Sequence, residues 1–197
     1  MKQGIKSIEK LYEELIRQRE ARQDLSADTS LLTFNSIKGN SVINVNTDND
    51  VLSYYVSDIA HRQLADYLNI PFKYYERMLN EQPQLLDMNV NCWLMSNPQK
   101  RMLRTLDGKL RAFLSDRYRR LDNLELMDHI MPVIAQMKGC EVISQDITET
   151  HLYLKVINKT LKAEISTGDV VQAGFVISNS EIGLGALKIE PLVHRLV

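Results

Sequence analysis

The sequence predicts an α+β fold: a mainly antiparallel sheet with a helical insertion and an amphipathic N-terminal helix. Apolar residues recur at helical spacing near the N-terminus and between residues 57 and 97. Short apolar or alternating runs, separated by turn residues, occupy most of the remainder. The 197 residues are 44% apolar and 25% charged, as in globular proteins with one buried core. A single domain over residues 1–197 is therefore expected, with residues 57–97 as a helical subregion.

The N-terminal helix is expected from about Ser7 to Gln23. Ile8, Leu11 and Leu15 fall on one of its faces, and charged residues fall on the opposite face. Two short strands should follow, at residues 31–34 and 41–45, joined by a turn at residues 38–40.

The helical subregion has recognisable start and stop signals. Ser57 or Asp58 is a suitable N-cap for a first helix, which Asn69-Ile70-Pro71 interrupts. Pro71 suits the first turn of a second helix. A third helical stretch is expected from Pro83 to Met95, ending at Asn97-Pro98.

A hairpin is expected next. Met102–Leu106 and Lys109–Leu114 have the composition of strands, and Asp107-Gly108 between them is a strong two-residue hairpin loop because both residues tolerate a positive φ. A helix over residues 124–138, ended by Gly139, should follow.

The remainder is expected to be β-rich. Strands are predicted at residues 141–147, 151–157, 161–165, 170–178 and 186–197. Because the chain ends inside a strand-like segment, we expect it to be the N-terminal part of a longer protein.

The most informative functional feature is the basic segment from Lys100 to Arg120, which contains eight Lys or Arg and two Asp. Regular pairing across the loop sets Arg104 opposite Arg111, with Phe113 on the same face. The predicted binding residues are Arg104, Lys109, Arg111, Phe113, Arg117, Arg119 and Arg120. The opposite face of the hairpin is apolar and should meet the core.

Cations around an exposed ring on a sheet suit single-stranded nucleic acid, since they neutralise phosphates while the ring stacks on a base. The alternative is a solvated or salt-bridged face, because Arg104 and Arg111 repel each other unless an acid lies between them, and Phe113 would then pack under a helix. The net charge of −1 means that any affinity must come from local clustering.

Other motifs favour structure over chemistry. The helices between Ser57 and Leu79 resemble a helix–turn–helix, but the second has few side chains suited to base edges. Residues 178–185 contain two glycines without the rest of a nucleotide-binding loop, so a turn or bulge is expected. The histidines (His61, His129, His151 and His194) lack metal-ligand spacing. No metal or cofactor is predicted, and a non-enzymatic role is favoured.

The compartment follows from the cysteines and the N-terminus. Cys92 and Cys140 fit a reduced cell interior, and the first residues are neither a signal nor a transit peptide. No apolar run reaches bilayer-spanning length. A soluble cytoplasmic protein without a membrane partner is expected.

Three segments together resemble a known family: LNIPFKYYERML (residues 68–79), LRAFLSDRYRRLDN (110–123) and ISNSEIGLGALKIEPLVHRLV (177–197). They are similar to the phage- and plasmid-like proteins grouped as domain of unknown function 932, from about Ser57 onward. In that family the strand resembling residues 195–197 usually continues into a segment with a cysteine and an asparagine-glycine pair. The resemblance implies a bacterial, phage or plasmid setting and assigns no catalytic residue.

Three functional hypotheses follow. The first is a mobile-element protein that binds single-stranded nucleic acid, such as single-stranded DNA in recombination or replication, through the basic hairpin. The second is a protein-interaction or counter-defence module, whose N-terminal helix and 57–97 helices bind a host or phage protein. The third is part of a nucleic-acid-modifying enzyme completed by residues beyond 197. Oligomerisation is open in each.

Overall fold

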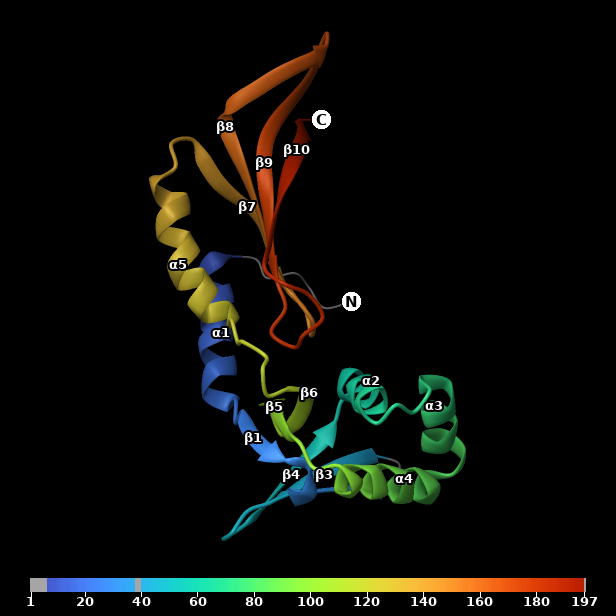
Figure 1. Ribbon diagram of the computed structural model, residues 1–197. Coiled ribbons are helices and arrows are strands. Elements are labelled where there is room, and N and C mark those ends of the chain that lie inside the picture. Colours follow the sequence, from blue (N-terminus) through green and yellow to red (C-terminus); the bar gives the residue numbers. More distant parts are fainter. Residues whose placement is uncertain (1–6, 38–39, 197) are drawn as a thin grey trace. The chain divides into compact units, whose positions relative to one another are not determined.

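The computed structural model describes residues 7–37 and 40–196, and the chain divides into two compact units (Figure 1). Unit 1 combines Met1–Glu20 with Arg119–Val197, and unit 2 is the continuous segment Ala21–Tyr118. The predicted α+β class is confirmed, with helices beside mostly antiparallel strands. Two units stand where the sequence predicted one, because neither crossing between them has the composition of a linker.

Unit 2 is built on a six-stranded sheet with the order β1-β5-β6-β4-β3-β2. Its strands are β1 (Leu25–Asp28), β2 (Leu32–Ile37), β3 (Asn40–Asn46), β4 (Val51–Val56), β5 (Lys100–Leu106) and β6 (Lys109–Ser115). All neighbours pair antiparallel except β4 and β6, which are parallel. A short 3₁₀ helix, η1 (Thr29–Leu31), joins β1 to β2. Strands β1 and β4 were not predicted from the sequence, and two residues of the predicted turn, Lys38 and Gly39, lie outside the described residues.

Three helices of unit 2 lie in the predicted helical subregion: α2 (Asp58–Tyr67), α3 (Phe72–Glu81) and α4 (Pro83–Ser96). The Ser57 side chain caps α2 by accepting a hydrogen bond from the Ala60 amide at 3.2 Å. Asn69, with a φ of 55°, ends the helix in the left-handed conformation that asparagine tolerates. The helices and the sheet share one core, in which Tyr75, Leu86 and Phe113 are buried.

The free edge of β2 is closed by side chains of α4. The Asn91 amide group accepts a hydrogen bond from the Phe34 amide at 2.7 Å and donates one to the Phe34 carbonyl at 2.8 Å. The Asp87 carboxylate accepts from the Ser36 amide at 3.0 Å and from its hydroxyl at 2.8 Å. These side chains therefore stand where another strand would otherwise pair.

Unit 1 has a four-stranded antiparallel sheet with the order β10-β9-β8-β7 and two helices. Its elements are α1 (Ile8–Ala21), α5 (Asn123–Gln136), β7 (Cys140–Ile147), β8 (Leu152–Ser166), β9 (Asp169–Asn179) and β10 (Lys188–Leu196). Both helices pack on one face of the sheet, where Leu11, Met127 and Leu154 are buried together (Figure 1). The two strands predicted at residues 151–157 and 161–165 are the single long strand β8.

The glycine-containing segment after β9 has a structural role. The Glu181 carboxylate is 5% exposed and accepts a hydrogen bond from the Asn123 amide at 2.6 Å, at the start of α5. Asn179 donates to the Leu121 carbonyl and to the Asn123 side chain, both at 2.9 Å. A carboxylate is favourable at a helix N-terminus, so this segment fixes α5 to the end of the sheet.

Within the ranges that the structure describes, none of the helices is both long enough and apolar enough to cross a membrane.

Candidate functional site

The predicted hairpin between β5 and β6 forms, but its register changes halfway. Asp107 and Gly108 have φ values of 51° and 71°, and Leu106 pairs with Lys109 as predicted. A β-bulge then shifts the pairing, so that Arg104 lies opposite Ala112 and not opposite Arg111. One extra residue in one strand moves the following side chains to the other face of the sheet.

This shift makes the predicted exposure of Phe113 wrong. Phe113 is 1% exposed and belongs to the core under the helices. Its ring centroid lies 5.4 Å from that of Tyr67 on α2. Its amide donates a hydrogen bond at 2.7 Å to the side chain of Gln63, also on α2. The ring is therefore a packing residue and is closed to a nucleobase.

The predicted exposure of Arg104 is wrong as well. Arg104 is 1% exposed, and its Nε donates to Asp24 Oδ2 at 3.0 Å. The other carboxylate oxygen of Asp24 accepts from the Thr105 amide at 2.9 Å, and Arg22 Nε lies 3.5 Å from Asp24 Oδ2. A buried guanidinium needs such a partner, because an unpaired charge inside a protein is costly.

The other predicted residues do not restore a single basic face. Lys109 is exposed beside the hairpin loop, Arg111 is half-buried, and Arg117 is exposed beyond the far end of β6. Lys109 and Arg117 thus flank opposite ends of the same strand. Arg119 and Arg120 are exposed and belong to unit 1.

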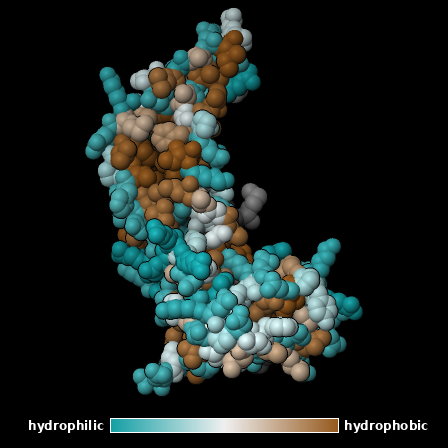
Figure 2. Space-filling model, in the orientation of Figure 1, coloured by the Kyte–Doolittle hydropathy of each residue, from teal (hydrophilic) through white to brown (hydrophobic). Residues whose placement is uncertain are grey.

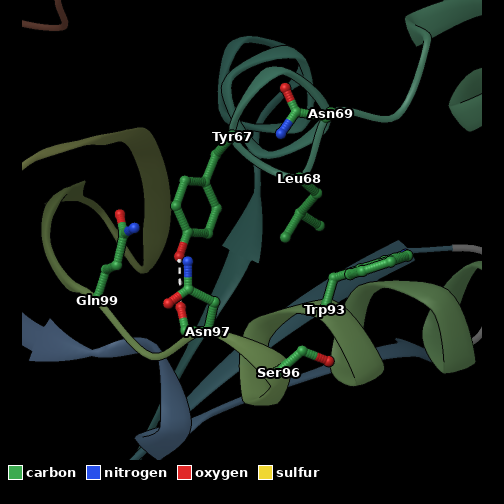
Figure 3. Close-up of a pocket in the computed structure, with 7 residues that line it drawn as sticks. All are labelled: Tyr67, Leu68, Asn69, Trp93, Ser96, Asn97 and Gln99. Atoms are coloured by element: carbon green, nitrogen blue, oxygen red, sulfur yellow. Dashed lines mark hydrogen bonds between the residues drawn. The ribbon is translucent and has the colours of Figure 1, made fainter.

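The structure instead presents a hollow in unit 2, between the end of α2 and the end of α4 (Figure 3). Its volume is about 680 Å³. Its lining consists of Tyr67, Leu68, Asn69, Trp93, Ser96, Asn97 and Gln99. Trp93, the one tryptophan of the sequence, is 52% exposed there. We refer to this feature as the Trp93 hollow.

Local hydrogen bonds fix the walls of the Trp93 hollow. In Figure 3 the Tyr67 ring points from α2 toward Asn97, and its hydroxyl donates to the Asn97 carbonyl at 3.4 Å. The backbone of Gln99 is fixed to Thr29, since the Thr29 amide donates to its carbonyl at 3.0 Å and its own amide donates to Thr29 Oγ1 at 3.1 Å. The amide side chain of Gln99 is exposed on this fixed backbone.

Arg101 supports Tyr67 from the sheet. Its guanidinium carbon lies 4.4 Å from the Tyr67 ring centroid and 5.1 Å from that of Phe113. Burial lowers the pKa of Arg101, while electrostatic interaction with Tyr67 and Asp116 opposes that shift. Its Nε is buried and, among the described residues, has no hydrogen-bond partner. Cation–π contact with two rings thus compensates part of its desolvation.

A second polar pair, His61 and Tyr75, is sealed in the core of unit 2. His61 Nδ1 lies 2.8 Å from the Tyr75 hydroxyl, and the two residues are 6% and 0% exposed. Burial lowers the pKa of His61 to about 4, and the nearby Asp58 charge opposes that shift. Burial also raises the pKa of Tyr75. A neutral histidine is therefore the form that fits this core.

The Trp93 hollow was not predicted from the sequence, because residues of two separate helices and of the following loop line it. One signal was available: α4 has apolar residues on two opposite sides, whereas a helix at the surface usually has them on one. Across residues 7–37 and 40–196, no group of three or more His, Cys, Asp or Glu is arranged to hold a metal ion.

Comparisons with known proteins add no relative. No protein-family model matches this sequence, and searches of curated proteins and of solved structures likewise give no match. The resemblance to domain of unknown function 932 therefore stays a prediction.

Proposed function

We propose that unit 2 binds single-stranded nucleic acid and takes one unpaired base into the Trp93 hollow. The observation that carries this proposal is a half-exposed indole beside a hollow lined with amide and hydroxyl groups. Any of the bases can stack on an indole, because every base has a π face, so this contact does not depend on the nucleic-acid sequence.

The polar lining suits the edge of a base. Asn69, Asn97 and Gln99 are exposed, and each side-chain amide carries both donors and an acceptor. Bases present donors and acceptors side by side on their edges, and asparagine and glutamine match such pairs. Leu68 adds an apolar contact to the lining.

The charge near the Trp93 hollow is modest. Two exposed cations lie near it. Lys100 directly follows Gln99. Arg117 comes two residues after Ser115, the strand partner of Arg101. Asp28 lies opposite Lys100 in the pairing of β1 with β5, and its negative charge offsets part of this positive charge. Two or three phosphate contacts should therefore form, and log Kd should change with log salt by a slope of about 1.5 to 2.

Trp93 allows a direct test, because its fluorescence is the sole tryptophan signal of the chain. Titration with a poly-dT oligonucleotide at low salt should quench this fluorescence to saturation, and a duplex of the same length should not. In anisotropy measurements with a labelled oligonucleotide, Trp93→Ala should weaken binding at least about tenfold, in line with the loss of one stacked base. Trp93→Phe should retain most of the affinity.

Tyr74→Ala is the matched control, since Tyr74 is a 50% exposed aromatic on α3 outside the lining of the hollow. It should leave binding unchanged. Absence of quenching at low salt, or equal affinity of Trp93→Ala and the parent chain, would overturn the proposal. The resemblance to domain of unknown function 932 suggests where such binding acts: recombination or replication of a phage or plasmid.

One observation favours the protein-interaction hypothesis as a second candidate. The outer face of α4 is apolar and exposed, so part of the 57–97 subregion is suited to contact another protein. The N-terminal helix does not share this property throughout, because Leu11 and Leu15 are buried within unit 1. If α4 binds a host protein, that protein should co-purify with the chain after nuclease treatment and should be lost on Met88→Glu substitution.

A further inference from the structure

Helix α4 is apolar on the side opposite its buried face. Leu86, Val90 and Leu94 are fully buried against the core of unit 2. The opposite side carries a row of exposed residues that we call the outer stripe: Leu85, Met88, Cys92 and Met95. Leu85, Met88 and Met95 are 40%, 71% and 57% exposed, and Cys92 is an exposed free cysteine. Figure 2 shows apolar and near-neutral residues at the surface of this helical region.

The spacing of the outer stripe is that of a helix that pairs with another helix. Its residues follow one another at intervals of three, four and three, which is the a/d repeat of a coiled coil over two heptads. A surface helix of a monomer usually places polar residues on this side. Methionine suits such a contact, because its flexible side chain adapts to an apolar partner.

The residues that flank the outer stripe carry no charge. They are Gln84, Asn89, Asn91 and Ser96. The one ionisable carboxylate of α4, on Asp87, faces β2 and binds Ser36. Charges at flanking positions are the usual means by which helices reject a copy of themselves. Their absence from this helix permits two identical stripes to meet without repulsion.

We infer that the outer stripe of α4 packs against the outer stripe of a second copy of this chain. A row of apolar residues with uncharged flanks is complementary to itself about a two-fold axis, as a symmetric dimer requires. The 14 residues of α4 are about 21 Å long, so the contact is small. The dimer belongs with weak interfaces, whose dissociation constants lie in the micromolar to millimolar range.

Sedimentation equilibrium of the whole chain tests this inference. Average mass should rise toward that of a dimer between about 10 μM and about 1 mM, the range expected for a contact of this size. Met88→Glu places a charge in the contact and should raise the dissociation constant at least about tenfold; Met95→Glu should act in the same way. Both positions are exposed, so the fold tolerates these changes, and urea unfolding verifies this.

Val133→Glu is the matched control, because Val133 is 58% exposed on α5 and lies outside the outer stripe. It should leave self-association unchanged. Cys92 gives a second measurement: in a Cys140→Ser background, a short bis-maleimide should link two chains through Cys92, two residues from the middle of the stripe. Trp93→Ala should still self-associate, which separates this inference from nucleic-acid binding.

Monomeric behaviour throughout the concentration range would overturn the inference. Unchanged association of both Met88→Glu and Met95→Glu, or an equal loss in Val133→Glu, would do the same.

Discussion

Units 1 and 2 each have a sheet with helices packed on one face. They differ in the burial of their ion pairs and in what lies along their edge strands. Unit 2 buries the Arg104–Asp24 ion pair and closes the edge of β2 with Asp87 and Asn91. In unit 1 one of the two edge strands, β10, has side chains of Ile189 and Val193 that are 65% and 70% exposed. Breaking the buried ion pair should therefore cost unit 2 much of its stability. In unit 1 the enclosed polar contacts are the hydrogen bonds of Glu181, Asn179 and Asn123, and the Asp169–Arg195 ion pair lies nearer the surface.

The largest difference should come from removing an aspartate in each unit. Asp24→Ala takes away the carboxylate that accepts from the buried Arg104 Nε, and should lower the free energy of unfolding by about 3–5 kcal/mol. Asp169→Ala removes the ion pair with Arg195, whose side chain is 65% exposed, and should cost less than about 1 kcal/mol. Urea unfolding of both variants measures the contrast; equal losses would contradict it.

The second effect is a pH dependence of unit 2 that originates at His61. Because burial lowers the pKa of His61 to about 4, the unfolded chain binds a proton more readily between pH 6.5 and 4. This contribution to stability is complete above pH 6.5 and is lost as the pH falls toward 4, by about 3 kcal/mol in total. Unfolding of the parent chain and of His61→Gln across this range measures it. If His61 is not the origin, the two curves should run parallel, with a difference in unfolding free energy that does not change with pH.

The smallest of the three effects concerns the closed edge of β2. Asn91→Ala leaves the Phe34 amide and carbonyl without the side-chain amide that binds both, and should cost about 2 kcal/mol. Asn46→Ala removes an exposed bond to the Leu31 carbonyl and should cost well under 1 kcal/mol, about what a solvated contact contributes. Thermal unfolding distinguishes the two. If Asn46→Ala lowered the unfolding free energy as much as Asn91→Ala, the hydrogen bonds from α4 to the edge of β2 would contribute no more than an exposed contact.

Local signals predicted several features of the fold. Asp107-Gly108 gave the hairpin loop and Asn69-Ile70-Pro71 separated α2 from α3, because each depends on the backbone preferences of a few neighbouring residues. The bulge at Arg111 depends on tertiary contacts. Ser57 Oγ donates to the Arg111 carbonyl at 3.2 Å, and Gln63 binds the Phe113 amide.

The site was less predictable for the same reason. Regular strand pairing placed Arg104 on the exposed face, because its partner Asp24 lies 80 residues away in the sequence. Once Arg104 and Phe113 are placed in the interior, the predicted basic face no longer exists. The Trp93 hollow brings together residues of two helices, and no short motif records such a meeting.

The division of the chain also has a consequence for the order of folding. Unit 2 is one uninterrupted segment, whereas unit 1 needs α1 from the start of the chain and α5 with its strands from the end. During synthesis, Ala21–Tyr118 is complete before the partners of Leu11 and Leu15 have been made. Unit 2 can therefore fold first. Once folded, it fixes Ala21 and Tyr118 in space, so a shorter flexible loop remains to be closed when α1 packs on the sheet of unit 1.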